Sequence, residues 1–303
     1  MQYLYSRDTS EALNIVKIGI IGKTSIEKTY ELAKDLTKWL GERGVEVYVE
    51  KEIGKKIRHK PSVARSEIPE LVDVILVFGG DGTFLGVARL ACKFGTPILG
   101  INLGSLGFLT EITVDELFPM MERIISGDYE IENRQMLRTV IYREGTVIGS
   151  YEVLNDVVIN KGAVARIIDL GIYIDGTHVT TYRADGIILS TPTGSTAYSL
   201  SAGGPIIHPG LPVTLITPIC PHTLTNRPFV VSNDMKVEVK VDTEEPDTYL
   251  TLDGQIGIQL KTGDTIELQH ADTSVKLIKS PFRDYFSILK TKLMWGEGYG
   301  KID

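Results

Sequence analysis

The sequence has few cysteines, no long apolar run and no excess of basic residues, and each absence excludes a class of protein. Cys92 and Cys220 are the only cysteines among 303 residues, and they stand far apart. A disulfide framework or a zinc site is therefore not expected. No apolar stretch approaches the length of a membrane span, and the N-terminus lacks the apolar core of a signal peptide. A net charge of −7 argues against a general nucleic-acid or membrane surface, so we expect neither nucleic acid nor a membrane as a partner. With few cysteines and no signal-type core, the reducing cytoplasm is the expected location.

The hydrophobic share of 43% and the charged share of 23% are those of an ordinary globular protein, and the length favours two domains. Up to about residue 125, strand-like and helix-like segments alternate, which predicts a parallel, Rossmann-like doubly wound α/β domain. The expected strands are Ile15–Ile21, Val45–Val49, Val74–Phe78 and Pro97–Asn102. The basic, polar stretch 51–65 is expected to be a loop.

From Met136 onward the pattern changes to short β-type runs separated by turn residues such as Asp253-Gly254, which predicts a β-sandwich. The final segment, Pro281 to Trp295, returns to helical spacing. Its apolar stripe predicts a helix that packs back on the first domain. The stripe consists of Phe282, Tyr285, Phe286, Leu289 and Leu293. The expected domains are 1–128, 129–280 and 281–303.

The stretch Val77-Phe78-Gly79-Gly80-Asp81-Gly82-Thr83-Phe84 carries the strongest chemical signal. A strand, a glycine-rich turn and a helix present backbone N–H groups to phosphate. A carboxylate is costly beside an anion unless it has a task, either holding a metal that carries the phosphate or accepting a proton from an attacking hydroxyl. Both tasks indicate phosphoryl transfer, whereas the plainer alternative is a tight turn in which Asp81 caps the helix.

Gly22-Lys23-Thr24 resembles the end of a P-loop, but Lys17 stands where the upstream glycine is required. We therefore set this tripeptide aside as a phosphate site and expect Thr24, with Glu27, to cap the following helix. No G-x-G-x-x-G follows a strand either, so the usual dinucleotide fingerprint is absent.

Three further segments are candidates for ligand binding. The loop from Asn102 to Leu109 should lie beside Gly79–Gly82 if their strands are neighbours. Asn155-Asp156 can read a base edge and a ribose hydroxyl, although a β-turn is the commoner explanation. The segment from Tyr182 to Pro205 is so rich in hydroxyls and glycines that we interpret it as a source of neutral donors for a sugar–phosphate ligand.

Taken together, these motifs resemble those of the NAD kinase family. The matching residues are Gly79-Gly80-Asp81-Gly82, Asn155-Asp156, Ala184-Asp185-Gly186, Thr191-Pro192-Thr193-Gly194-Ser195-Thr196-Ala197-Tyr198, Gly203-Gly204-Pro205 and Pro221-His222-Thr223-Leu224. The first motif is shared with diacylglycerol kinases and phosphofructokinases, whereas the TPTGSTAY stretch followed by GGP is much more specific. Asp156 stands where many members of the family have Glu.

The resemblance implies a phosphotransferase that moves the terminal phosphoryl group of ATP or polyphosphate to the 2′-hydroxyl of the adenosine ribose of NAD. It implies that Asp81 orients or deprotonates that hydroxyl and that Mg²⁺ arrives with ATP. It assigns no residues as ligands of the metal. The residues implied to bind substrate or nucleotide are Gly80, Gly82, Thr83, Phe108, Asn155, Asp156, Arg183, Asp185, Thr193, Thr196, Ala197, Tyr198, Ser201, His222 and Gln255.

Within the implied site, Asp185 contacts the ligand of a neighbouring chain, so a homodimer or homotetramer is expected. Arg183, His222 and Arg227 are the nearest expected cations for a polyphosphate. Two alternatives stay open from sequence: a non-catalytic NAD(P)-binding or sensing module, which would not need the carboxylate of Asp81, and a lipid or sugar kinase that shares GGDG.

Overall fold

The computed structural model describes residues 16–162, 167–223, 225–243 and 247–295, and the chain divides into two compact units. Unit 1 comprises the chain up to Glu132 together with the segment from Leu277 onward, and unit 2 comprises Asn133–Lys276. No helix of the described part is long and apolar enough to cross a membrane.

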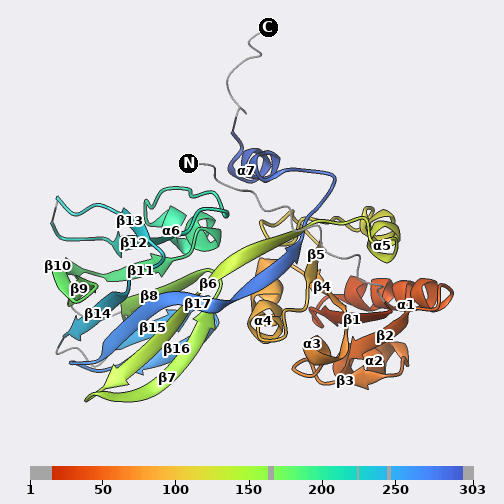
Figure 1. The fold of residues 1–303 in the computed structure, drawn as a ribbon, viewed down its shortest axis with the longest axis horizontal. Helices are drawn as coiled ribbons and strands as arrows, with labels where there is room; N and C mark the ends of the chain where they lie inside the picture. Colours follow the sequence, from red (N-terminus) through yellow and green to blue (C-terminus); the bar gives the residue numbers. More distant parts are fainter. Residues whose placement is uncertain (1–15, 163–166, 224, 244–246, 296–303) are drawn as a thin grey trace, which may run out of the picture. The chain divides into compact units, whose positions relative to one another are not determined.

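Unit 1 is a parallel sheet flanked by helices (Figure 1). Its elements are β1 (Lys17–Gly22), α1 (Glu27–Gly41), β2 (Glu46–Glu50), α2 (Lys51–Ile57), β3 (Ser62–Val63), α3 (Ile68–Leu71), β4 (Val74–Gly79), α4 (Asp81–Ala91), β5 (Ile98–Asn102), α5 (Leu117–Ile125) and α7 (Tyr285–Leu293). The strand order is β3-β2-β1-β4-β5, which confirms the doubly wound fold. The strand expected from Ile15 begins at Lys17, and Ile15 itself lies outside the described residues.

The central strands β1, β4 and β5 of unit 1 are largely apolar and buried because helices cover both faces of the sheet. Ile18 and Ile20 of β1 join the core formed with α1 and α5. Gly19 faces the other way, where an added Cβ would lie 2.4 Å from Ile68 of α3. The glycine therefore lets α3 pack closely against this strand.

The expected loop at 51–65 is wrong, because it contains α2 and β3. Ile53 supplies an apolar anchor that is fully buried, while the charged residues around it face solvent. A single buried isoleucine among many lysines gave too weak a periodic signal to predict this helix.

Unit 2 contains two sheets that share one apolar core, as expected of a β-sandwich. One sheet has the order β13-β12-β11-β8-β15-β16, from Phe229–Ser232, Val213–Ile219, Gly186–Ser190, Asp156–Lys161, Thr248–Leu252 and Ile256–Leu260. The other contains β10 (Thr177–Ala184), β9 (Ile168–Ile174), β14 (Val237–Asp242) and β17 (Thr265–Ile278), with β6 (Ile131–Arg143) and β7 (Thr146–Val153). The short 3₁₀ helix η1 (Thr193–Thr196) and α6 (Tyr198–Ser201) follow β11.

The C-terminal helix α7 belongs to unit 1, but the stripe expected to be buried is only partly so. Ile288 and Leu289 are buried, whereas Phe282 and Phe286 are 43% and 60% exposed. The segment before the helix is held instead by polar contacts, since the guanidinium of Arg283 donates to the carboxylate of Glu116. Asp284 and Ser287 form a capping box that fixes the first turn of α7.

These exposures give a matched pair of substitutions in one helix. We expect Leu289→Ala to lower the free energy of unfolding by about 2–5 kcal/mol, because it leaves a cavity at a buried position. The exposed Phe286→Ala should change it by roughly 0.5 kcal/mol or less. Urea unfolding of both variants checks the pair, and equal losses would contradict this assignment of the buried face.

Candidate active site

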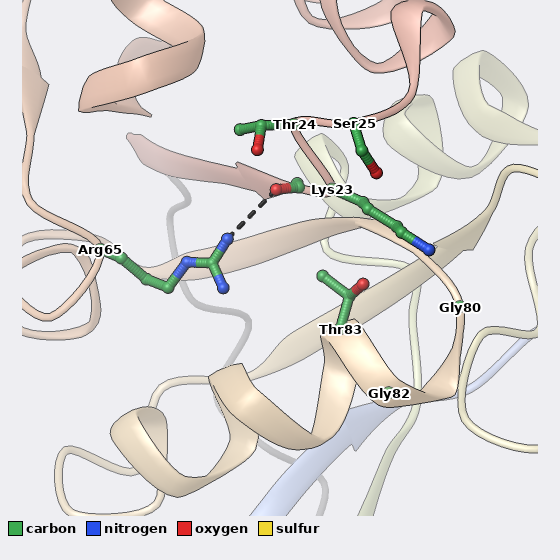
Figure 2. A pocket seen from close by; sticks show the side chains of 8 residues that line it. Lys23, Thr24, Ser25, Arg65, Gly80, Gly82 and Thr83 are labelled. Carbon is green, nitrogen blue, oxygen red and sulfur yellow. Dashed lines mark hydrogen bonds between the residues drawn. The ribbon is translucent and has the colours of Figure 1, made fainter. Parts of the chain in front are cut away.

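Unit 1 has a pocket where its strand order reverses. From β1 the chain winds one way to β2 and β3 and the other way to β4 and β5, so the reversal lies between β1 and β4. Ligands of such sheets bind outside the carboxyl ends of the strands at this point. A pocket of about 420 Å³ lies there, lined by Gly22, Lys23, Thr24, Ser25, Arg65, Gly80, Gly82 and Thr83 (Figure 2).

Gly22, Lys23 and Thr24, which we set aside as a phosphate site, all line this pocket. The N–H of Lys23 donates to the carbonyl of Phe78 at 2.8 Å, which joins this turn to the end of β4. Figure 2 shows the Lys23 side chain extending towards the Gly80 turn. The expected cap at Thr24 is also wrong, since Ile26 holds the N-cap position of α1 without a side-chain hydrogen bond.

A half-buried ion pair fixes the end of β1 at the pocket. Arg65 donates to both carboxylate oxygens of Glu50, at 2.9 and 3.0 Å, and to the carbonyl of Gly22 at 3.1 Å. The N–H of Gly22 donates to the same Glu50 carboxylate at 3.2 Å. Both backbone groups of Gly22 are therefore held, and the residue that follows it, Lys23, starts from a fixed position.

Asp81 is the first residue of α4, and its carboxylate is held by the loop after β5. It accepts hydrogen bonds from the backbone N–H groups of Phe108, Leu109 and Thr110 at 2.9–3.1 Å, and from the Thr110 hydroxyl at 3.0 Å. Three of these four bonds go to Oδ1, and only that of Phe108 goes to Oδ2. Oδ2 therefore keeps capacity to accept one more proton donor.

The loop that follows Asn102 lies beside Gly79–Gly82, which confirms the expected neighbourhood. β4 and β5 pair in parallel with Gly79 opposite Asn102. A Cβ added at Gly107 would lie 2.1 Å from Oδ1 of Asp81, so only glycine leaves room for the carboxylate. Phe108 is half-buried, and the amino group of Lys292 in α7 lies 5.9 Å from the centre of its ring.

In unit 2, three adjacent strand ends bring together residues far apart in the sequence. β8 begins at Asp156, opposite Ser190 at the end of β11. On its other side, Val157 pairs with Leu252 at the end of β15, and Asp253 follows. The Asn155-Asp156 turn therefore lies between the start of η1 and the Asp253 turn.

The expectation that the hydroxyl-rich segment supplies many donors to a ligand is wrong for several of its members. Ser190, Thr191, Ser195 and Ser199 are fully buried and bond within the protein. The Thr191 hydroxyl, for example, donates to the carbonyl of Leu154 at 2.6 Å. These hydroxyls fix the turns of the site rather than face a ligand.

Two polar atoms near this turn are left without a hydrogen-bond partner among the described residues. They are Oδ1 of Asn155 and the hydroxyl of Thr193, both buried. An unpaired buried polar group costs about 1–3 kcal/mol, so such groups require an explanation. A bound ligand that donates to Asn155 and exchanges a hydrogen bond with Thr193 would supply the missing partners.

Asp156 is 5% exposed and lies near a second acid. Burial, and after it the negative charge of Asp253, raise the pKa of Asp156 to about 7. The Asp253 carboxylate itself accepts from the N–H groups of Leu154, Asn155 and Asp156.

The other expected site residues of unit 2 lie in two places. Thr196, Ala197, Tyr198 and Ser201 follow Thr193 along η1 and α6, and Tyr198 is 44% exposed. Gln255 is exposed two residues beyond Asp253. Asp185 precedes β11 and forms an ion pair with Lys161 at 3.0 Å. The backbone N–H of His222 donates to the backbone carbonyl of Arg183 at 2.9 Å, and both residues are exposed.

Asp185 therefore lies at the opposite end of β11 from Asn155-Asp156. The strand Gly186–Ser190 separates them, which at about 3.3 Å per residue is roughly 16 Å. The cations that line the pocket of unit 1 are Lys23 and Arg65. The expected role of Arg183 and His222 as cations for a polyphosphate stays a prediction.

Sequence reasoning missed Lys23, Arg65 and Asp253. The order of the strands, rather than any motif, places Lys23 beside Gly80. Asp253 was assigned only to a turn, although an acid directly before Gly254 at a strand end could have been matched to the Asn155 turn. Among the described residues, no group of three or more His, Cys, Asp or Glu side chains gathers as a metal site.

Comparison with known proteins assigns the family. The ATP-NAD kinase N-terminal domain model matches residues 18–129, and the C-terminal domain model matches 154–280. The chain belongs to the NAD kinase family. Members of this family phosphorylate NAD to NADP.

Relatives and solved structures agree with this assignment. The NAD kinase of Geotalea daltonii is 52% identical over 281 residues, which are 93% of this chain and 99% of that protein. That of Syntrophotalea carbinolica is 49% identical, with the same coverage. The crystal structure of yeast NADH kinase complexed with NADH matches with a TM-score of 0.87 at 26% identity, covering 96% of this chain and 90% of that one. An NAD kinase from Archaeoglobus fulgidus in complex with ATP matches with a TM-score of 0.72 at 26% identity, covering 92% and 98%.

The raised pKa of Asp156 predicts a pH-dependent stability difference. Its folded-state pKa of about 7 lies above the usual 3.8, so between these values the folded chain binds more protons and stability falls as pH rises. Above pH 7 the full penalty is on the order of 4 kcal/mol, at about 1.36 kcal/mol per pH unit. Asp156→Asn should therefore stabilise the protein more at pH 8 than at pH 5, as measured by urea unfolding. A difference that does not change with pH would contradict this.

Proposed function

We propose that this NAD kinase transfers the terminal phosphoryl group of ATP, or of polyphosphate, to the 2′-hydroxyl of the adenosine ribose of NAD, and that Asp81 accepts the hydroxyl proton. The observation that carries the proposal is the Asp81 carboxylate, fixed by the 108–110 loop at the start of α4, where Gly80, Gly82 and Thr83 line the pocket. A module that only binds NAD(P) would need no such carboxylate at that place.

The pocket is the proposed site of the donor phosphates. Lys23 supplies a positive charge, and the positive end of the α4 helix dipole lies at the pocket, where Gly80, Gly82 and Thr83 line it. Mg²⁺ is expected to arrive as the counterion of ATP, because this ion usually keeps several waters and binds through substrate phosphates and one or two carboxylates. It neutralises charge on the phosphates when bound.

The reaction follows from this arrangement. The 2′-oxygen forms a bond to the terminal phosphorus, and the bond from that phosphorus to the bridging oxygen breaks, leaving its electron pair on ADP or on the shortened polyphosphate. The hydroxyl proton passes to Oδ2 of Asp81, the oxygen that accepts a single hydrogen bond from the residues that the structure describes. Phosphoryl transfer depends mainly on such positioning and on neutralising charge.

Unit 2 supplies the proposed recognition of NAD. Oδ1 of Asn155 can accept from the adenine amino group, and Thr193 can exchange a hydrogen bond with the ligand, which would satisfy both unpartnered atoms. Asp156 accepts from a ribose hydroxyl. Contacts along the rest of the ligand are proposed for Thr196, Ala197, Tyr198, Ser201, Gln255 and, from unit 1, Phe108.

Self-association as a homodimer or homotetramer is part of the proposal. Asp185 lies a strand's length from Asn155-Asp156 and is paired with Lys161. This separation supports a role for Asp185 towards the ligand of a neighbouring chain rather than its own. A fully active monomer at micromolar concentration, seen by light scattering, would refute that role.

The function is tested by incubating the purified protein with NAD, Mg²⁺ and either ATP or polyphosphate, and by detecting NADP with an NADP-specific dehydrogenase. NADP formation with at least one donor is expected. Its absence with every donor, in a folded protein that binds NAD, would favour a non-catalytic binding module.

Asp81→Asn should lower kcat by about 10²–10⁴-fold, because the amide keeps the shape of the side chain but cannot take the hydroxyl proton. Equilibrium binding of NAD should fall much less than kcat, because the amide oxygen can still accept the three hydrogen bonds that go to Oδ1 and most of the proposed NAD contacts lie in unit 2. The exposed Asp35→Asn on α1 is the matched control and should keep wild-type kcat. Wild-type turnover in the Asp81 variant would contradict the assignment of Asp81 as the general base.

Lys23→Met should raise the KM for ATP by roughly 10–100-fold, since a hydrogen bond to a charged group contributes about 1.5–3 kcal/mol. The KM for NAD should change little. Lys28→Met, at an exposed position on α1 outside the pocket, controls for the loss of a charge. Equal effects of both variants would contradict a specific role of Lys23.

A further inference from the structure

The backbone of the turn 154–156 is completely paired. Its three N–H groups donate to the Asp253 carboxylate, from Leu154 at 3.2 Å, from Asn155 at 2.7 Å and from Asp156 at 3.3 Å. An ionised carboxylate only accepts hydrogen bonds, so it matches three converging donors, and hydrogen bonds to a charged acceptor are the stronger kind.

The carbonyls of the same turn are satisfied as well. The Leu154 carbonyl accepts from the Thr191 hydroxyl, and the Asn155 carbonyl accepts from the Thr191 N–H at 2.9 Å and from the Ser190 hydroxyl at 3.1 Å. The Asp156 carbonyl accepts from the N–H of Asp253 at 3.0 Å. The turn therefore has one fixed form, and within it Oδ1 of Asn155 is a buried atom without a hydrogen-bond partner among the described residues.

Asp253 also acts on Asp156 through its charge. Asp156 is buried between β11, whose facing residue Ser190 is neutral, and β15, which leads into Asp253. Among the described residues, Asp253 is the charged side chain whose field shifts the titration of Asp156, and with burial it raises the pKa of Asp156 to about 7.

We propose that Asp253 is a positioning residue for the acceptor NAD. It holds the turn 154–156 in its binding form, and its negative charge makes the affinity for NAD depend on pH near neutrality. The proposal rests on the assignment of this turn to NAD under the proposed function. A ribose hydroxyl donates a stronger hydrogen bond to a carboxylate than to a carboxylic acid. Affinity for NAD should therefore fall as pH drops below 7, by up to about tenfold per pH unit where ionised Asp156 is required.

The test is NAD binding to the wild-type protein and to Asp253→Asn, measured by titration calorimetry from pH 6 to pH 8 without a donor. The amide offers one acceptor oxygen in place of two, and its NH₂ group then faces at least one of the three donors, so the turn should loosen. We expect NAD affinity at pH 8 to fall about tenfold or more, while the KM for ATP changes little. The midpoint of the pH dependence should move to lower pH, because the negative charge beside Asp156 is gone.

Asp264→Asn is the matched control. Asp264 is also buried in unit 2, accepts from the N–H of Lys261 at 2.8 Å in another turn, and pairs with Arg143. Its loss should lower stability without moving the pH midpoint of NAD binding. A shift of that midpoint specific to Asp253→Asn is a result that a merely structural role would not give.

Unchanged NAD affinity and an unchanged pH midpoint in a folded Asp253→Asn protein would overturn the proposal. If that variant does not fold, Asp156→Asn decides. A pH dependence present in the wild type and absent from Asp156→Asn supports the proposal, whereas wild-type affinity that is flat from pH 6 to 8 overturns it. Failure of the proposed function would appear separately, as the absence of NADP in the donor assay.

Discussion

A carboxylate that accepts from three successive backbone N–H groups is the interaction on which both halves of the machinery depend. In unit 1 Asp81 holds residues 108–110, and in unit 2 Asp253 holds residues 154–156. Each carboxylate gives its segment a single form. Under the proposed function, this reduces the ordering that substrate binding must supply.

Close approach of an oxygen, rather than backbone freedom, explains two of the glycines near these turns. A Cβ at Gly107 would lie 2.1 Å from the Asp81 carboxylate, and one at Gly194 would lie 2.1 Å from the carbonyl of Asn155. Neither glycine has a positive φ. Both are required because a carboxylate in one case, and a carbonyl in the other, must approach the chain where a side chain would stand.

The sequence predicted the architecture well because both domains follow simple periods. Buried parallel strands read as apolar runs, as in Val74–Phe78, and the sandwich strands are bounded by turn residues. Helix α2 escaped prediction because its fully buried apolar residue is a single isoleucine.

Site residues that belong to one continuous motif could be predicted from the sequence, whereas residues that the fold brings together from distant segments could not. Asp81 and the Asn155-Asp156 pair stand in recognisable stretches. Lys23 becomes a pocket residue only through the order of β1 and β4, and Asp253 reaches Asn155 from 98 residues away in the sequence. The hydroxyls of 190–199 show the converse. Their density suggested ligand contacts, but a buried hydroxyl needs a partner, and carbonyls of the neighbouring turns were available.

The Asp156–Asp253 pair shows how stability and function oppose each other in this unit. Burial and, after it, the negative charge of Asp253 favour the protonated form of Asp156, and this is why its pKa is raised. An apolar or amide residue there would make the fold more stable at neutral pH, but it could not offer the carboxylate that the proposed function assigns to a ribose hydroxyl. Under that proposal, a hydroxyl that donates to Asp156 stabilises its ionised form and offsets part of the energy that burial costs. A neutral side chain in place of Asp253 would relieve this repulsion, but it would hold the three N–H groups of the turn more weakly, because a carboxylate is the stronger acceptor.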